Sequence, residues 1–115
     1  MIINIEGVNS RMIANNLTAS QPMHPGELLK DELEARGISQ KAFSEEIGIR
    51  PSIISEIIHG KRSISIEYAM LFEAALDIDA DFWLKLQSDY DKEVVKANKS
   101  FMQRLNEIRK VAAFL

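Results

Sequence analysis

From residue 25 onward, apolar side chains recur at intervals of three or four residues, which is the period of an amphipathic α-helix. The pattern predicts helices over residues 25–36 and 65–76, two short helices between Ser39 and Gly60, and a further helix after Asp79. The helix over residues 65–76 is expected to bury Ala69, Leu71, Phe72, Ala75 and Leu76. The pattern therefore indicates an all-α fold.

Residues 39–62 form the most informative stretch, because they predict two short helices joined by a glycine turn. Ser39 can accept hydrogen bonds from the free N–H groups that begin the first helix. Gly48 ends that helix, since glycine takes the left-handed conformation without steric cost. Pro51 suits the first turn of the second helix, where its missing N–H is not needed. The inward face of the second helix is expected to consist of Ile54, Ile57 and Ile58.

Positive charge flanks the second helix. Arg50 precedes it, and Lys61 and Arg62 follow the glycine where it should stop. An exposed helix with cations at both ends is what binding in a DNA major groove requires. The stretch is therefore interpreted as a helix-turn-helix unit.

The first 22 residues form a region of their own. Ile2, Ile3, Ile5 and Val8 give a weak strand-like alternation, after which Asn, Ser and Thr dominate. The region is interpreted as an arm or an edge strand, with a disordered terminus as the alternative.

The C-terminal segment contains neither proline nor glycine and predicts one long amphipathic helix. The apolar stripe of such a helix can be covered in three ways. The helix can fold back onto its own domain, pair with a second copy, or bind a partner protein. Its Lys and Arg residues are interpreted as a solvated face rather than a nucleic-acid surface. The stripe consists of Tyr90, Val94, Ala97, Phe101, Leu105, Ile108, Ala112 and Leu115.

Composition sets limits that agree with these patterns. A chain of 115 residues with 46% apolar residues fits one compact domain. The absence of cysteine excludes disulfides and thiolate metal sites. No apolar run approaches the roughly 20 residues that span a bilayer, and no secretion signal is present. A cytoplasmic location without membrane contact is expected.

The net charge of −3 excludes a polycation that coats nucleic acid. Residues 1–84 carry 7 Lys/Arg and 13 Asp/Glu, whereas residues 85–115 carry 7 and 4. Because the acidic part contains the helix-turn-helix unit, any DNA binding must depend on locally clustered cations.

Candidates for catalysis are poor. His24 and His59 lack partners at metal-ligand spacing, so no metal site is expected and His24 is interpreted as structural. The serines lack a glycine-flanked nucleophile turn, and adjacent Glu45 and Glu46 point in different directions on a helix. The sequence predicts no enzyme and no cofactor.

Three segments in order resemble one known family. The stretch 39–62 is similar to the Xre-type helix-turn-helix family. Met23-His-Pro-Gly-Glu-Leu-Leu29 before it and Asp81-Phe-Trp-Leu-Lys-Leu-Gln87 after it resemble the HigA/VapI antitoxin branch. The resemblance covers residues 23–90 and implies a lambda-repressor-like five-helix DNA-binding domain there. Residues 1–22 would then form an N-terminal arm, and residues 91–115 a C-terminal amphipathic helix extension.

The resemblance also implies a DNA face. In the family, residues that open the second helix reach the base edges, which here are Arg50, Ser52 and Ser55. Arg50 is the best candidate, because its fork can donate two hydrogen bonds to guanine, although a phosphate contact is the alternative. Few direct hydrogen bonds to base edges are expected, since this chain has Pro51 and Ile53 where the family commonly has polar residues. Ile53 is a candidate for contact with a thymine methyl group. Contacts to the DNA backbone are expected from Gln40, Lys41, Lys61 and Arg62.

A short segment contains a large apolar group, which is typical of a core or an interface: Phe82, Trp83, Leu84 and Leu86. The family resemblance favours a dimer interface.

The resemblance implies an antitoxin that binds double-stranded operator DNA as a homodimer and neutralises a cognate toxin, a ribonuclease. The N-terminal arm or the C-terminal stripe would contact that toxin. Two alternatives stay open: a stand-alone Xre-type transcriptional regulator, and a protein-interaction module with degenerate DNA binding.

Overall fold

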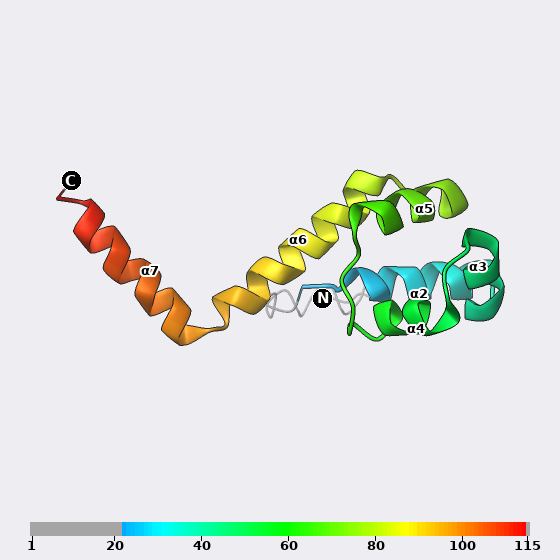
Figure 1. Ribbon diagram of the computed structural model, residues 1–115, viewed down its shortest axis with the longest axis horizontal. Helices are drawn as coiled ribbons and strands as arrows, with labels where there is room; N and C mark the ends of the chain where they lie inside the picture. Colours follow the sequence, from blue (N-terminus) through cyan, green and yellow to red (C-terminus); the bar gives the residue numbers. More distant parts are fainter. Residues whose placement is uncertain (1–21, 115) are drawn as a thin grey trace, which may run out of the picture. The chain divides into compact units, whose positions relative to one another are not determined.

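A computed structural model describes residues 22–114, and in these residues it contains six helices and no strand (Figure 1). The all-α prediction is confirmed. The predicted arm lies almost entirely outside the described residues. The helices are α2 (Pro25–Arg36), α3 (Gln40–Ile47), α4 (Pro51–Ile58), α5 (Ile66–Leu76), α6 (Ala80–Lys96) and α7 (Lys99–Ala112).

Local chemistry sets the ends of the first three helices. Gly37 and Gly48 end α2 and α3 with φ angles of 67° and 75°, which glycine adopts without strain. The Ser39 hydroxyl accepts a hydrogen bond from the Ala42 N–H at 3.0 Å and so caps α3. Pro51 occupies the first turn of α4. The roles of Ser39, Gly48 and Pro51 predicted from the sequence are confirmed.

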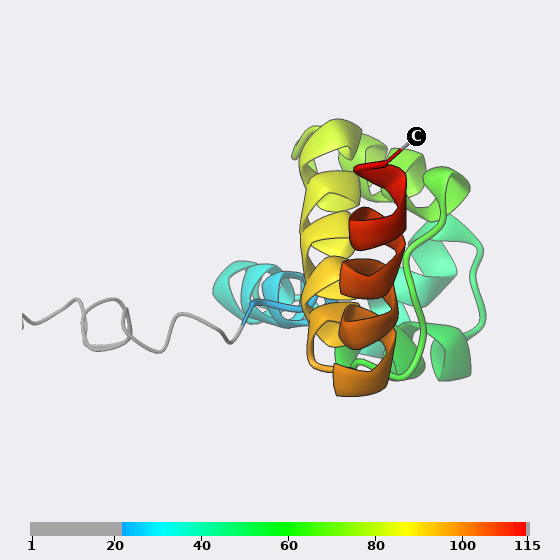
Figure 2. The same cartoon turned by 90° about the vertical axis from the view of Figure 1, so that its left-hand side faces the viewer.

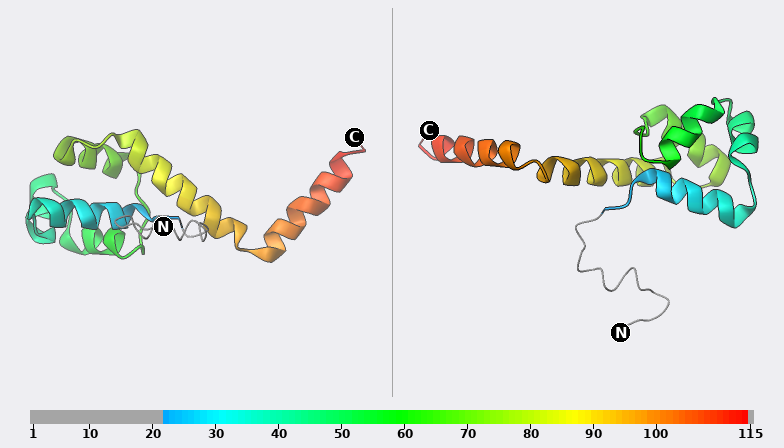
Figure 3. Two further views of the ribbon diagram at one scale, coloured as in Figure 1. Left: turned by 180° about the vertical axis from the view of Figure 1, so that it is seen from behind. Right: turned by 90° about the horizontal axis from the view of Figure 1, so that it is seen from below.

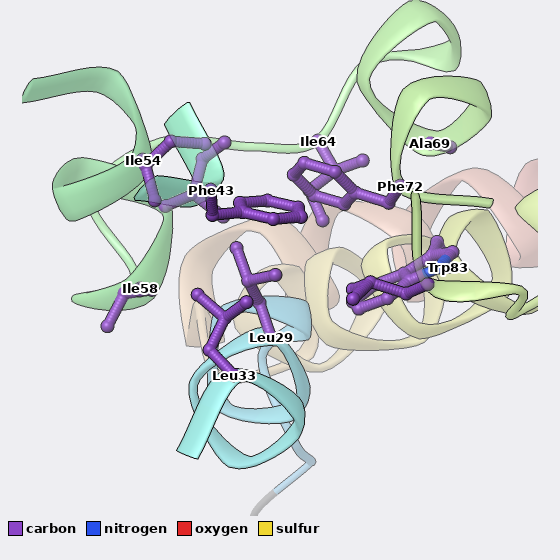
Figure 4. Close-up of a cluster of buried hydrophobic side chains, with 11 residues drawn as sticks. Leu29, Leu33, Phe43, Ile54, Ile58, Ile64, Ala69, Phe72 and Trp83 are labelled. Carbon is purple, nitrogen blue, oxygen red and sulfur yellow. The ribbon is translucent and has the colours of Figure 1, made fainter. Parts of the chain in front are cut away.

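The core of the unit formed by residues 23–91 lies between α2, α3, α4, α5 and the first turns of α6 (Figure 4). Three aromatic rings connect three of these helices. The Phe72 ring lies 5.7 Å from that of Phe43 and 5.2 Å from that of Trp83, centroid to centroid. The fully or almost fully buried apolar residues are Leu29, Leu33, Phe43, Ile54, Ile57, Ile58, Ile64, Ala69, Phe72, Leu76 and Trp83.

One predicted core position on α5 is wrong. Leu71 is 36% exposed, while Ala69, Phe72 and Leu76 are buried. Those three residues are three and four positions apart and share one face of the helix, whereas Leu71 lies beside that face. Ala75 is partly buried against the core.

The connection between α4 and α5 is an extended segment (Figure 2), and a side-chain hydrogen bond joins it to α6. The buried Gln87 side chain accepts a hydrogen bond from the Ile64 N–H at 2.8 Å and donates one to the Asp91 carboxylate at 2.9 Å. At the start of α6, the Asp79 carboxylate accepts a hydrogen bond from the Asp81 N–H at 2.9 Å and so caps the helix.

The prediction of one uninterrupted C-terminal helix is wrong. The helical segment is present, but α6 ends at Lys96 and α7 begins at Lys99 (Figure 3). Asn98 has an extended backbone between them, and its side chain accepts from the Phe101 N–H at 3.0 Å. Asparagine competes for backbone hydrogen bonds in this way, so it starts a new helix even where no glycine or proline is present.

No helix within residues 22–114 combines the length and the apolar character needed to cross a membrane. The same residues contain no group of three or more His, Asp or Glu side chains arranged to hold a metal ion.

Candidate nucleic-acid interface

The helix-turn-helix unit consists of α3, the turn at Gly48 and α4. Both α2 and α3 pack against α4. Ile54, Ile57 and Ile58 fix α4 to the core, as the sequence predicted. With those residues turned inward and Ile53 partly buried against the core, the outward face of α4 includes Ser52, Ser55 and Glu56.

The segment His24-Pro25-Gly26 holds α2 against the end of α4. The His24 Nδ1 accepts a hydrogen bond from the Gly26 N–H at 2.8 Å, and the Glu27 carboxylate accepts one from the His24 N–H at 3.4 Å. Together they form a capping box at the start of α2. A Cβ atom on Gly26 would lie 1.8 Å from the Ile57 carbonyl oxygen. Only glycine therefore allows the two backbones to approach this closely.

His24 is structural, as predicted. The residue is 5% exposed, and its ring meets the Tyr90 ring edge-on, with centroids 4.8 Å apart. Burial lowers the pKa of this imidazole below 6.5, and the nearby Glu27 and Asp91 carboxylates oppose the shift only in part. The neutral ring leaves Nδ1 free to accept from Gly26.

The outward face of α4 begins beside Arg50, which precedes the helix and makes no side-chain capping bond. Arg50 and Ser52 are exposed, and Ser55 is half-buried with its hydroxyl 3.4 Å from the His59 ring. Ile53 is partly buried against the core, which leaves it less surface for a thymine methyl group than an exposed side chain would have. The base-reading roles of Arg50, Ser52 and Ser55 stay predictions.

Cations lie at both ends of this face. Gln40 and Lys41 are exposed in the first turn of α3, and Lys61 and Arg62 are exposed in the turn after α4. Lys41 and Lys61 have exposed ammonium-bearing side chains suited to phosphate. Arg62 differs, because its Nε donates to the Glu56 carboxylate at 2.8 Å. The predicted contacts to the DNA backbone can therefore be made from four exposed side chains, of which Arg62 already has an acidic partner.

The unit of residues 23–91 is acidic overall and contains few cations. Residues 23–91 carry seven Lys/Arg and fourteen Asp/Glu, which is a formal charge of −7. Four of the seven cations are Lys41, Arg50, Lys61 and Arg62. Binding to a polyanion would therefore rest on this local group rather than on the charge of the unit.

The predicted dimer-interface role of Trp83 is wrong. Trp83 is 0% exposed within its own chain, and its indole N–H donates to the Ile78 carbonyl at 3.1 Å. It has no surface to offer a second copy. Phe82 is 47% exposed and Leu86 is half-buried, so both stay predictions for the interface.

Sequence reasoning missed three features of the unit: the contact between Gly26 and Ile57, the bridge made by Gln87, and the ion pair of Glu56 with Arg62. Gly26 and Gln87 belong to the segments Met23–Leu29 and Asp81–Gln87, on which the family resemblance depends. The sequence did not reveal the tertiary contacts that these two residues make.

A family model described as helix-turn-helix matches residues 29–83. The chain is 41% identical over 71 residues to virulence-associated protein A′ of Dichelobacter nodosus, covering 61% of this chain and 62% of that protein. It is 36% identical over 75 residues to antitoxin HigA-1 of Vibrio cholerae, covering 64% of this chain and 70% of that protein. The chain belongs to the HigA/VapI family of Xre-type helix-turn-helix proteins.

A solved structure of this HigA/VapI family, Pseudomonas aeruginosa antitoxin HigA with the higBA promoter, superposes with a TM-score of 0.65 at 30% identity. The alignment covers 75% of this chain and 92% of that one. This superposition on a HigA protein that was solved with promoter DNA confirms the all-α helix-turn-helix fold predicted from the sequence. The chain spans 62% of the length of the D. nodosus relative.

Proposed function

We propose that this HigA/VapI protein is a sequence-specific DNA-binding antitoxin that represses its own operon and neutralises a ribonuclease toxin. The observation that carries the proposal is the likeness of its helix-turn-helix unit to the HigA structure with promoter DNA. The exposed Arg50 and Ser52 at the start of α4 and the cations on either side support the DNA-binding part. The name of the Vibrio relative supports the antitoxin part.

In this proposal α4 enters the major groove of double-stranded operator DNA. Arg50 donates to a guanine, and Ser52 and Ser55 contact neighbouring base edges. Gln40, Lys41, Lys61 and Arg62 contact phosphates and set the register. The protein acts by binding, without a catalytic residue or cofactor of its own, and binding to operator DNA would place it in the cytoplasm.

A binding experiment on the operon's upstream DNA tests the proposal. The unchanged protein should bind one duplex far more tightly than unrelated duplexes, and its affinity should fall as salt rises. Lys61→Ala should weaken binding to all sequences similarly and reduce the salt slope by about one unit, because one phosphate contact is lost. Arg50→Ala should cost about 1 to 3 kcal/mol at a single base pair and relax the preference there.

Each outcome has a meaning. Affinity that is weak and independent of sequence would favour the interaction module, which the charge of −7 on residues 23–91 also fits. An unchanged preference at every position for Arg50→Ala would reduce that residue to a phosphate contact. Specific binding without a toxin gene beside this one would favour the stand-alone regulator.

A further inference from the structure

A carboxylate lies near the centre of the outward face of α4. Residues advance about 100° around a helix, so Glu56 projects away from the buried side formed by Ile54, Ile57 and Ile58. Ser52 and His59 lie on the same outward side. The Glu56 side chain is 45% exposed. A negative charge on a surface that contacts DNA is repelled by the phosphates and lowers the affinity for every sequence, unless a favourable contact with a base compensates for it.

The turn after α4 brings a cation onto this carboxylate. The Lys61 N–H donates to the Glu56 carbonyl at 2.8 Å, which directs the turn back along the helix. Arg62 then places its Nε 2.8 Å from Glu56 Oε1. Oε2 of the carboxylate stays available as an acceptor, and four N–H donors of the guanidinium stay available as well. Within residues 22–114, Oε2 of Glu56 and these four N–H donors of Arg62 have no other hydrogen-bond or ion-pair partner.

We propose that Glu56 is a specificity-determining residue that accepts a hydrogen bond from the N4 amino group of one cytosine in the operator. The inference rests on the proposed DNA-binding function. An ionised carboxylate only accepts hydrogen bonds, and cytosine is the base that presents a donor without an adjacent acceptor in the major groove. Guanine and thymine present acceptors there, which the carboxylate repels, and adenine presents an acceptor beside its donor.

Arg62 is the positioning residue for Glu56. Its contact with Oε1 fixes the carboxylate and leaves Oε2 for the base. It also offsets the negative charge beside the DNA backbone, and its free donors are suited to the nearest phosphate. Arg62 would therefore contribute both to overall affinity and to preference at the base pair that Glu56 reads.

The experiment measures base preference at every operator position on randomised duplexes, for the full chain and its variants. Glu56→Gln should lower the preference for cytosine about tenfold at one position, since the amide also donates. Its affinity for unrelated DNA should rise, because a negative charge leaves the DNA face. Arg62→Gln should relax the preference at the same position, and Arg62→Lys should restore it in part.

Glu73→Gln is the matched control, because it makes the same charge change at an exposed position of α5. It should leave the preference unchanged and raise unrelated affinity less than Glu56→Gln does. Thermal unfolding of each variant checks that the fold is retained. If the unchanged protein is sequence-specific but neither Glu56→Gln nor Arg62→Gln alters any position, the inference is overturned and the proposed function stands. Absence of specific binding by the unchanged protein would overturn both.

Discussion

At the scale of single residues, Gly26 sets how closely α2 can approach α4. Exchange of a helical glycine for alanine ordinarily stabilises a helix. Here the added Cβ would lie 1.8 Å from the Ile57 carbonyl oxygen and 3.0 Å from the Ile58 Cα, both of them backbone atoms that cannot rotate away. Gly26→Ala should therefore destabilise the protein by about 2 to 3 kcal/mol, which urea unfolding would measure.

Gly37→Ala separates this steric effect from backbone strain. Gly37 has a φ of 67° with no atom within 4 Å of an added Cβ, so only the left-handed conformation is penalised. That penalty is about 1 kcal/mol. A Gly26→Ala variant as stable as the unchanged protein would show that the two helices can move apart at little cost.

His24 gives the fold a dependence on pH. Its pKa is lowered in the folded protein, so the folded state holds fewer protons than the unfolded state between that lowered pKa and 6.5. Stability is then fully present above pH 6.5 and is lost as the pH falls through this window. Protonation also places a proton on the Nδ1 that accepts from Gly26. Urea midpoints measured from about pH 7.5 downward should fall accordingly.

His24→Asn is the control, because asparagine can cap a helix but does not titrate in this range. Its urea midpoint should vary less with pH than that of the unchanged protein. Equal pH dependence in the two proteins would mean that another group is responsible.

Single-residue chemistry that acts on its own neighbours was predictable from the sequence. Ser39, Gly48 and Pro51 do what their types favour, since a cap or turn depends on atoms two to four residues away. Gly26 and Gln87 were not predictable in this way. Their partners, Ile57 and Ile64, lie more than 20 residues distant and are brought near only by the packed helices.

At the scale of helices, periodicity identified the elements but not always the buried side. In α6 the aromatic neighbours Phe82 and Trp83 look alike in sequence, yet one is 47% exposed and the other fully buried. Adjacent residues of a helix point in different directions, so two neighbours of similar character need not be equally buried. Which one does so depends on where Phe72 of α5 lies.

The break between α6 and α7 shows the same limit. The apolar stripe continues through residues 94–105 at helical spacing, and this favoured one helix. Asn98 caps α7 through a hydrogen bond to its third following residue, and this local bond outweighs continuation. Among the described residues of α7 none is buried, and Phe101, Ile108 and Val111 are exposed.

At the scale of the whole molecule, the revised interface predicts two separable variants. Phe82→Ala should weaken the homodimer about tenfold without unfolding it, because its ring is exposed on α6. Trp83→Ala should instead cost about 3 to 5 kcal/mol of folding stability by leaving a cavity. Sedimentation would measure the first and urea unfolding the second. In the dimer, operator half-sites should lie about one helical turn apart, roughly 34 Å.

A monomer in sedimentation at concentrations where operator binding is tight would contradict the dimer. An unchanged dimer in Phe82→Ala would move the interface away from α6, and the exposed stripe of α7 would be the next surface to vary. Phe101→Ser together with Ile108→Ser serves that purpose, because neither side chain is buried.

Charge separates the chain into parts suited to different partners. Residues 23–91 carry −7, whereas residues 92–114 carry six Lys/Arg and two Asp/Glu, or +4. A ribonuclease toxin is expected to be basic, because its substrate is a polyanion, so the acidic unit would speed its approach. Affinity must come from apolar contacts, and the basic C-terminal segment would oppose such a toxin.

The N-terminal residues Ile2, Ile3 and Ile5 are therefore the predicted toxin contact, although they lie outside the described residues. An extended segment with alternating apolar side chains is suited to adding a strand to a sheet edge on the partner. Deleting residues 1–20 should abolish rescue of cells that express the toxin of the neighbouring gene, while operator affinity changes little. The Phe101→Ser, Ile108→Ser variant should keep full rescue. If the truncated protein rescues the cells and the α7 variant does not, toxin binding belongs to the C-terminal stripe, contrary to the charge argument.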